Sequence, residues 1–147
     1  MNQNKTILIA ELGGTNARLA ITEDGKSLKN RYETKLEDSK SAEQLFRGYC
    51  SQIVGIPIRR AIIGVAAPML GEEVKLTNSN LEFNKKKLET LFSKQLLILN
   101  DLELQAHAIE ALEQKEIRRI GNVTESKKGS KILVSPGTGL GLAGFVG

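Results

Sequence analysis

The segment KTILIAELGGTNARLAIT, residues 5–22, contains two apolar runs separated by a pair of adjacent glycines. Residues 5–10 are typical of a buried strand, because apolar side chains follow one another almost without a break. Gly13 and Gly14 favour a tight turn between strands. Residues 16–22 resume the apolar character as a second strand. The chain is therefore expected to open with an antiparallel hairpin, not with a strand–helix–strand unit.

The rest of the N-terminal part alternates between strand and helix patterns. A third strand is expected at residues 27–35, followed by helices at 40–55, 84–94 and 100–112 and extended segments at 60–66, 74–77 and 95–99. Strands joined through helices pair in parallel by right-handed crossovers. The pattern predicts an α/β fold, with a mixed five-stranded sheet and helices on both of its faces.

Residues 131–146 repeat the opening pattern of strand, Gly-Thr turn and strand. The repetition indicates a second domain that begins as the first one does. We expect a small N-terminal lobe at residues 1–112, a polar linker at 113–130, and the first β-hairpin of a second, truncated lobe at 131–147.

Composition excludes several classes of protein. The 147 residues carry 21 Lys and Arg against 17 Asp and Glu, and the basic groups are scattered among acidic ones. A nucleic-acid-binding protein usually gathers its positive charge on one face, so no nucleic-acid partner is expected. One cysteine and one histidine leave no basis for a disulfide framework or a zinc cage. Neither a signal peptide nor a membrane-spanning run is visible, so a cytoplasmic location without membrane contact is expected.

The first candidate site is the turn at residues 11–15, Glu-Leu-Gly-Gly-Thr. Adjacent glycines let backbone N–H groups approach an anion such as a phosphate closely, and the Thr15 hydroxyl adds a donor. Glu11 could hold a hydrated Mg²⁺, which needs only one or two carboxylates. The alternative is a plain hairpin turn, in which Gly-Gly is common.

The second candidate site is Pro-Gly-Thr-Gly-Leu-Gly at residues 136–141, which also suits a phosphate. Gly139, Gly141 and Gly144 match a dinucleotide fingerprint, but a β-like stretch follows where that motif needs a helix. No Gly-x-x-x-x-Gly-Lys-Ser/Thr sequence is present, which excludes a P-loop NTPase.

The third candidate site is the pair Asn100-Asp101, where an apolar strand passes into a helix. Ligands of open α/β sheets bind beyond the carboxyl ends of such strands. Asn100 can orient a hydroxyl group, and Asp101 can accept its proton. The alternative is helix capping, because Asn100 and Glu103 have the spacing of a capping box.

The fourth candidate site combines residues 64–68, Gly-Val-Ala-Ala-Pro, with residues 76–78, Leu-Thr-Asn. A strand that ends in small residues and a proline leaves an open wall. Thr77 and Asn78 could face a ligand with several hydroxyl groups. The alternative is an ordinary turn.

These motifs, taken in order along the chain, resemble those of the bacterial glucokinases, which belong to the hexokinase–actin–heat-shock ATPase superfamily. The resemblance extends from about residue 6 to residue 147. It implies a ribonuclease-H-like, actin-like ATPase lobe and a second lobe across a cleft. It also implies that ATP lies between the two glycine turns and that glucose lies beside the Asn-Asp pair.

The resemblance assigns roles to individual residues. Binding of the ATP phosphates is implied for Ala10, Glu11, Leu12, Gly13, Gly14, Thr15, Gly137, Thr138, Gly139 and Gly141. Binding of the sugar is implied for Thr77, Asn78, Asn100 and Asp101. Asp101 is the implied general base, and Glu11 the implied Mg²⁺ ligand, directly or through water. The family usually has Asp at the position of Glu11, and its chains continue well beyond residue 147.

The expected function is therefore ATP- and Mg²⁺-dependent phosphorylation of glucose to glucose 6-phosphate by the intact protein, with residues 1–147 inactive alone. A non-catalytic sugar sensor is one alternative, and an ATP-driven protein of the actin or heat-shock class is another. The open edge of residues 131–146 leaves room for pairing with a second chain, as in a homodimer.

Overall fold

The structure, a computed structural model, describes residues 6–77, 79–92, 95–109, 111–122, 129–136 and 140–145. Contacts between residues divide the chain into two compact units, Met1–Asp101 and Leu102–Gly147. This division falls earlier in the chain than residue 112, the expected end of the small lobe. The assignment of residues to lobes stays a prediction.

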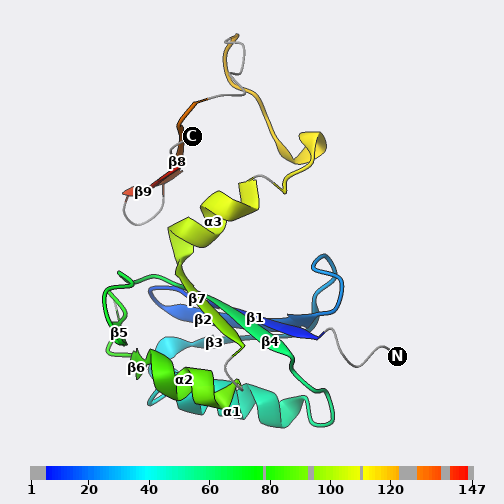
Figure 1. Cartoon of the computed structure of the whole chain (residues 1–147), viewed down its shortest axis with the longest axis vertical. Helices are drawn as coiled ribbons and strands as arrows, with labels where there is room; N and C mark the ends of the chain where they lie inside the picture. The colour runs from blue at the N-terminus through cyan, green and yellow to red at the C-terminus, as the bar shows by residue number, and fades with distance from the viewer. Residues whose placement is uncertain are drawn as a thin grey trace. The chain divides into compact units, whose positions relative to one another are not determined.

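A mixed five-stranded sheet forms the centre of the first unit (Figure 1). Its strands are β1 (Ile7–Leu12), β2 (Asn16–Thr22), β3 (Lys29–Lys35), β4 (Arg60–Val65) and β7 (Leu96–Asn100), in the order β3-β2-β1-β4-β7. The first three strands form an antiparallel meander, and β4 and β7 add in parallel to β1. The opening hairpin, the parallel additions and the mixed sheet are confirmed.

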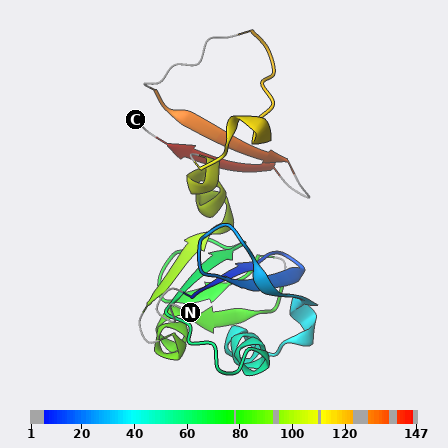
Figure 2. The ribbon, with the colours of Figure 1, turned by 90° about the vertical axis from the view of Figure 1, so that its right-hand side faces the viewer.

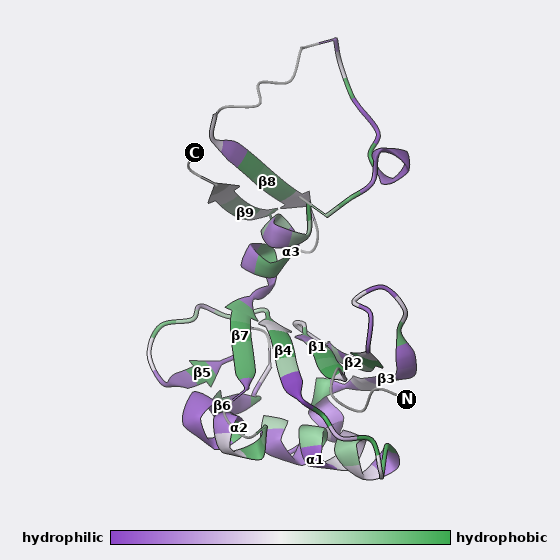
Figure 3. Ribbon diagram, turned by 45° about the vertical axis from the view of Figure 1, so that its right-hand side comes forward, coloured by the Kyte–Doolittle hydropathy of each residue, from purple (hydrophilic) through white to green (hydrophobic). Residues whose placement is uncertain are grey.

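Alternating side chains give this sheet one face that is largely buried. Leu8 pairs with Ala61, which in turn pairs with Leu96, and the next inward row contains Ala10 and Ile63. Leu8, Ala61 and Ile63 are fully buried. Hydrophobic colour runs along β4 and β7 in Figure 3. The period of two in burial along β1 follows from the pleat of a strand.

Two helices, α1 (Ala42–Gln52) and α2 (Lys85–Leu91), cover the buried face. Figures 1 and 2 show both helices on the same side of the sheet, which corrects the expectation of helices on both faces for this unit. The strands β1, β4 and β7 follow one another in one direction across the sheet. Right-handed crossovers that advance in one direction place their helices on one face. The third expected helix lies mostly in the second unit.

Both helices begin with a side-chain cap. The Ser41 hydroxyl accepts a hydrogen bond from the Gln44 backbone N–H, and the Asn84 side chain accepts one from that of Lys87. Each bond satisfies a donor that the first helical turn leaves unpaired. A turn after α1, which includes Val54 with 84% of its surface exposed, leads back to the start of β4.

A small two-stranded sheet lies beside α2. It pairs β5 (Glu73–Lys75) with β6 (Glu82–Asn84), and it buries Val74 and Phe83. The strand β6 was not predicted from the sequence, because three residues are too few to show a strand period. A 3-10 turn, η1 (Leu36–Asp38), follows β3 and leads toward α1, and its Leu36 side chain is buried.

The second unit contains most of α3 (Asp101–Ile109), the 3-10 turn η2 (Gln114–Glu116) and the hairpin of β8 (Lys131–Pro136) and β9 (Leu140–Phe145). The two strands expected within residues 131–146 are present and pair antiparallel, and residues 137–139 between them lie outside the described residues. One face of the hairpin is apolar and largely exposed, and its residues are Ile132, Val134, Leu140 and Leu142.

Among the described residues, no helix combines the length and the apolar character needed to cross a membrane.

Candidate functional site

The carboxyl ends of three parallel strands bring most of the predicted site residues to one edge of the first unit. In this edge row, Leu12 of β1 pairs with Val65 of β4, and Val65 pairs with Asn100 of β7. The glycine turn, the segment after β4 and the Asn100-Asp101 pair follow directly. This edge is where open α/β sheets bind their ligands.

The first glycine turn is held by its backbone. The Gly13 N–H donates to the Asn16 carbonyl at 3.0 Å, and the Leu36 N–H donates to the Thr15 carbonyl at 2.8 Å. A Cβ atom at residue 13 would lie 3.3 Å from the Asn16 carbonyl oxygen, so the turn has little room for a side chain there. The loop is thus fixed before any ligand binds.

Two residues of β1 before this turn, Ala10 and Leu12, have buried side chains. Ala10 and Leu12 point into the core, where Leu12 is fully buried. Their side chains therefore do not face a phosphate at this edge, and their backbone belongs to a strand that pairs with β2 and with β4. The prediction that they belong to a phosphate-binding segment is compatible with this placement and stays a prediction.

The segment 65–67 is fastened from two sides. The Asn100 Nδ2 donates to the carbonyl oxygens of Val65 at 3.4 Å and Ala67 at 3.1 Å. The Thr77 hydroxyl donates to the Ala66 carbonyl at 3.2 Å. Asn100 and Thr77, both predicted to contact sugar, therefore also shape the wall of the edge.

Asp101 is partly buried and is the first residue of α3, directly after the strand end. A carboxylate at a helix N-terminus interacts favourably with the helix dipole. Asn100 precedes the helix, which is the place expected for a capping residue. The catalytic and the structural interpretations of this pair are therefore compatible in space.

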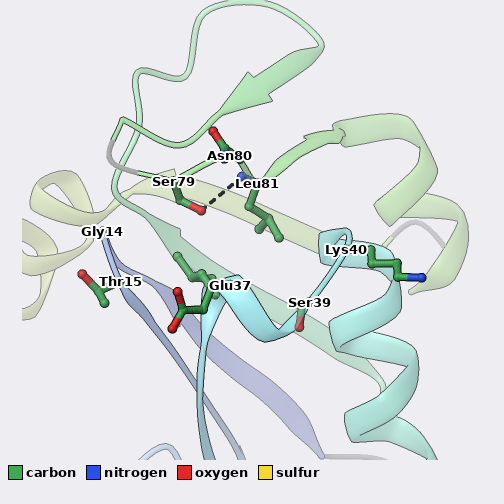
Figure 4. Close-up of a pocket in the computed structure, with 9 residues that line it drawn as sticks. Gly14, Thr15, Glu37, Ser39, Lys40, Ser79, Asn80 and Leu81 are labelled. Carbon is green, nitrogen blue, oxygen red and sulfur yellow. Dashed lines mark hydrogen bonds between the residues drawn. The ribbon is translucent and has the colours of Figure 1, made fainter.

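A pocket of about 580 Å³ lies against the glycine turn (Figure 4). Gly14 and Thr15 form one side, η1 a second side, and residues 79–81 a third. The full lining is Gly14, Thr15, Leu36, Glu37, Ser39, Lys40, Ser79, Asn80 and Leu81. The Leu81 N–H donates to the Ser79 hydroxyl at 3.1 Å. Hydroxyl and amide groups predominate, which suits a ligand that forms several hydrogen bonds.

Glu11 takes part in an ion-pair row that crosses β1, β2 and β3. The Arg18 Nη1 lies 3.2 Å from the Glu11 Oε2, and the Arg18 Nε lies 3.1 Å from the Glu33 Oε1. Hydrogen bonding to Glu11, followed by the negative charge of Glu33, raises the pKa of Arg18. About half of the Glu11 side chain is exposed, so its carboxylate is reachable from solvent.

This carboxylate fits a weakly held Mg²⁺. Mg²⁺ keeps several waters and is usually bound by one or two carboxylates together with substrate phosphates. Among the described residues, no group of three or more His, Cys, Asp or Glu side chains is arranged as a metal site. Glu11 would therefore hold the ion together with a phosphate ligand and water.

Several predicted residues cannot be compared with the structure. Asn78, Gly137, Thr138 and Gly139 lie outside the described residues. Gly141 is described, and it belongs to the second unit, opposite Ser135 in the hairpin. A Cβ atom there would lie 2.8 Å from the side chain of Leu102. Close packing against α3 is thus one reason for a glycine at this position, and its phosphate role stays a prediction.

Glu33 and the lining residues Ser79 and Asn80 were not predicted from the sequence as members of the site. Arg18 lies opposite Glu33 in the pairing of β2 with β3. The ion pair between them can therefore be predicted only when the register of these two strands is known. The register of a hairpin depends on its turn, and here a bulge shifts it between Leu19 and Ile21. No local sequence pattern predicts this shift in register.

Comparison with known proteins assigns the family. The family model described as Glucokinase matches residues 8–147. A glucokinase of Chelativorans sp. is 34% identical over 142 residues, which are 95% of this chain and 42% of that protein. A glucokinase of Neisseria meningitidis is 31% identical over 140 residues, again 95% of this chain and 43% of that protein. The chain thus spans about two-fifths of the length of these relatives.

Comparison with solved structures identifies the fold. The crystal structure of a glucokinase from an Antarctic psychrotroph matches with a TM-score of 0.82 and 30% identity, over 97% of this chain and 46% of that one. A glucokinase from Balamuthia mandrillaris, solved in complex with glucose, matches with a TM-score of 0.69 and 20% identity, over 97% of this chain and 44% of that one. The second likeness concerns the fold alone. The fold is that of the actin-like ATPase sugar kinases, and the chain belongs to the glucokinase family.

Proposed function

We propose that the intact protein that contains this chain phosphorylates glucose with ATP, giving glucose 6-phosphate and ADP. The observation that carries the proposal is the edge row in which Leu12, Val65 and Asn100 are neighbours. It places a rigid glycine turn and a strand-end Asn-Asp pair at one edge of one sheet. A kinase needs such an arrangement, because a phosphate cradle and a base must lie close together.

Asp101 is proposed as the general base. Its carboxylate accepts the proton of the C6 hydroxyl as that oxygen attacks the γ-phosphorus, and the bond from this phosphorus to the bridging oxygen of ADP breaks. Asn100 is proposed to orient the sugar from the end of β7, where its side-chain nitrogen also donates to the carbonyl oxygens of Val65 and Ala67. A base of this kind contributes about 10²- to 10⁴-fold to the rate.

The backbone of the turn at residues 13–15 is proposed to bind the transferred phosphoryl group. The Gly13–Asn16 and Leu36–Thr15 backbone bonds hold the turn in place, so little reorganisation is needed when charge develops. Because the Gly13 N–H already donates to Asn16, the N–H groups of Gly14 and Thr15 are the ones proposed to bind. A bound Mg²⁺ would neutralise charge on the phosphoryl oxygens, and Glu11 is the residue proposed to hold it. A ROK family glucokinase from Streptomyces griseus, which has a similar fold, was solved in complex with glucose and AMPPNP. That complex supports the proposal of an ATP-type nucleotide.

Two groups of expectations stay proposals. Gly137, Thr138, Gly139 and Gly141 are proposed as the second phosphate-binding turn, and Thr77 and Asn78 as neighbours of the sugar. The cytoplasmic location, the absence of nucleic-acid and membrane partners, and a homodimer also stay predictions.

The direct test is a coupled assay of the intact protein with ATP, Mg²⁺ and a panel of hexoses. We expect saturable formation of glucose 6-phosphate that Asp101→Asn removes. Tight glucose binding without turnover would instead favour the non-catalytic sugar sensor.

A further inference from the structure

Three charged residues form a cross-strand row on the face of the sheet that α1 and α2 leave uncovered. Glu11 lies opposite Arg18, and Arg18 lies opposite Glu33, in neighbouring antiparallel strands. The adjoining residues Leu12 and Ala17 point into the core, so the alternation of the strands directs the charged row to the other side. All three side chains are about half exposed.

Arg18 uses different nitrogen atoms for its two partners. Its Nη1 contacts Glu11 and its Nε contacts Glu33. Because a guanidinium is planar and carries five donors in fixed directions, loss of one contact leaves the other in place. Arg18 can therefore release Glu11 without releasing Glu33.

That release matters if Glu11 holds a metal ion. A carboxylate bonded to arginine has its charge compensated, so a cation must compete with the guanidinium for the same oxygens. On the side away from Arg18, the residue paired with Glu11 is Gly64, which has no side chain. A carboxylate that leaves Arg18 therefore meets no charged competitor in the adjacent position of β4.

We infer that Glu33 is a positioning residue that retains Arg18 when the Glu11 carboxylate turns from Arg18 to a divalent cation. Without the negative charge of Glu33, the Arg18 guanidinium would have Glu11 as its one partner in the row and would compete more strongly with the cation for the Glu11 oxygens. This inference rests on the proposed metal role of Glu11. It predicts that two substitutions in one row have opposite effects, since removing Glu33 weakens metal binding and removing Arg18 strengthens it.

The test is a titration of the ¹⁵N-labelled chain with Mn²⁺, which shares the preference of Mg²⁺ for oxygen ligands. The readout is the Mn²⁺ concentration that halves the amide signals of Gly13 and Thr15 by paramagnetic broadening. Glu33→Gln should raise this concentration roughly two- to fivefold, the range expected for one exposed ion pair, and Arg18→Gln should lower it by a similar factor. Glu33→Asp, which keeps the charge, should restore most of the wild-type value.

Glu23→Gln is the matched control, because Glu23 is also an exposed partner of one cation, Lys29, and is distant in sequence from the turn. It removes the same charge and should leave the midpoint unchanged. Equal midpoints for Glu33→Gln and Glu23→Gln, with broadening that still depends on Glu11, would overturn the role of Glu33 alone. Broadening that Glu11→Gln leaves unchanged would overturn the proposed metal role as well.

Discussion

The side-chain nitrogen of Asn100 lies 3.1 Å from the carbonyl oxygen of Ala67, and so the end of β7 is bonded to the segment that leaves β4. A second bond from the same nitrogen reaches Val65. The residue proposed to bind sugar is thus also a structural cross-link between two parallel strands. Substitutions at this position should therefore change stability and ligand binding together.

Asn100→Ala should lower the free energy of unfolding by about 1 kcal/mol, because a typical intramolecular hydrogen bond contributes that amount. Urea unfolding followed by circular dichroism measures the change. Asn80→Ala is the control, because Asn80 is an exposed residue of the pocket wall. Equal midpoints for the two variants would contradict the cross-linking role.

Asp101→Asn in the intact protein should reduce kcat by about two to four decades, with a smaller change in glucose affinity. The variant keeps the size of the side chain and removes the proton acceptor. Steady-state kinetics provides kcat, and isothermal titration with glucose provides the affinity. Near-normal turnover would exclude Asp101 as the base, and a lowered Tm with full activity would indicate a capping role instead.

Glu11→Asp should preserve or increase activity of the intact protein and shift its dependence on Mg²⁺, because the carboxylate moves by about one C–C bond. Glu11→Gln should lower activity in a way that added Mg²⁺ only partly restores. The measurement is initial rate against Mg²⁺ concentration at fixed ATP. Normal kinetics of Glu11→Gln at every concentration would show that the metal is held elsewhere.

Residues 1–147 alone should not phosphorylate glucose and should associate as the concentration rises. A hairpin of two strands is marginal in water, and the exposed apolar face of β8 and β9 gains by burial against a second copy. Sedimentation velocity over a range of concentrations detects the association. Replacing Val134 and Leu142, a cross-strand pair, with Thr should weaken it. Saturable turnover, or a monomer at high concentration with a protected hairpin, would contradict this prediction.

The stability of the turn at residues 22–27 should depend on pH. Asp24 accepts hydrogen bonds from the N–H groups of Ser27 and Lys26, and these bonds lower the pKa of Asp24 below its usual value. A lowered folded-state pKa gives stability that is present above the unfolded pKa of about 4 and is lost as the pH falls below it. Tm measured between pH 6 and pH 2.5 should fall less for Asp24→Asn than for the wild type. Parallel curves would exclude Asp24 as a contributor.

Strong local patterns made the first unit predictable. The apolar run before Gly13 and the repeated strand–helix units predicted the sheet, its mixed pairing and the edge at which the site residues meet. The face of the sheet that the helices cover was predicted less well. It depends on the order in which β1, β4 and β7 are placed in the sheet, and no single segment of the sequence determines that order. Glu33 was missed for a related reason, since its role depends on a bulge in the register.

The turn after α1 has a practical consequence for measurements on this protein. It precedes the amino end of β4, whereas the site residues follow the carboxyl ends of the strands, so a label at the exposed Val54 would stand at the opposite edge of the sheet. Burial raises the pKa of the one native thiol, Cys50, which slows its reaction with maleimides near neutral pH. A fluorophore attached through Val54→Cys would therefore mark the protein at a position remote from the site residues, so that the label itself does not obstruct the ligand.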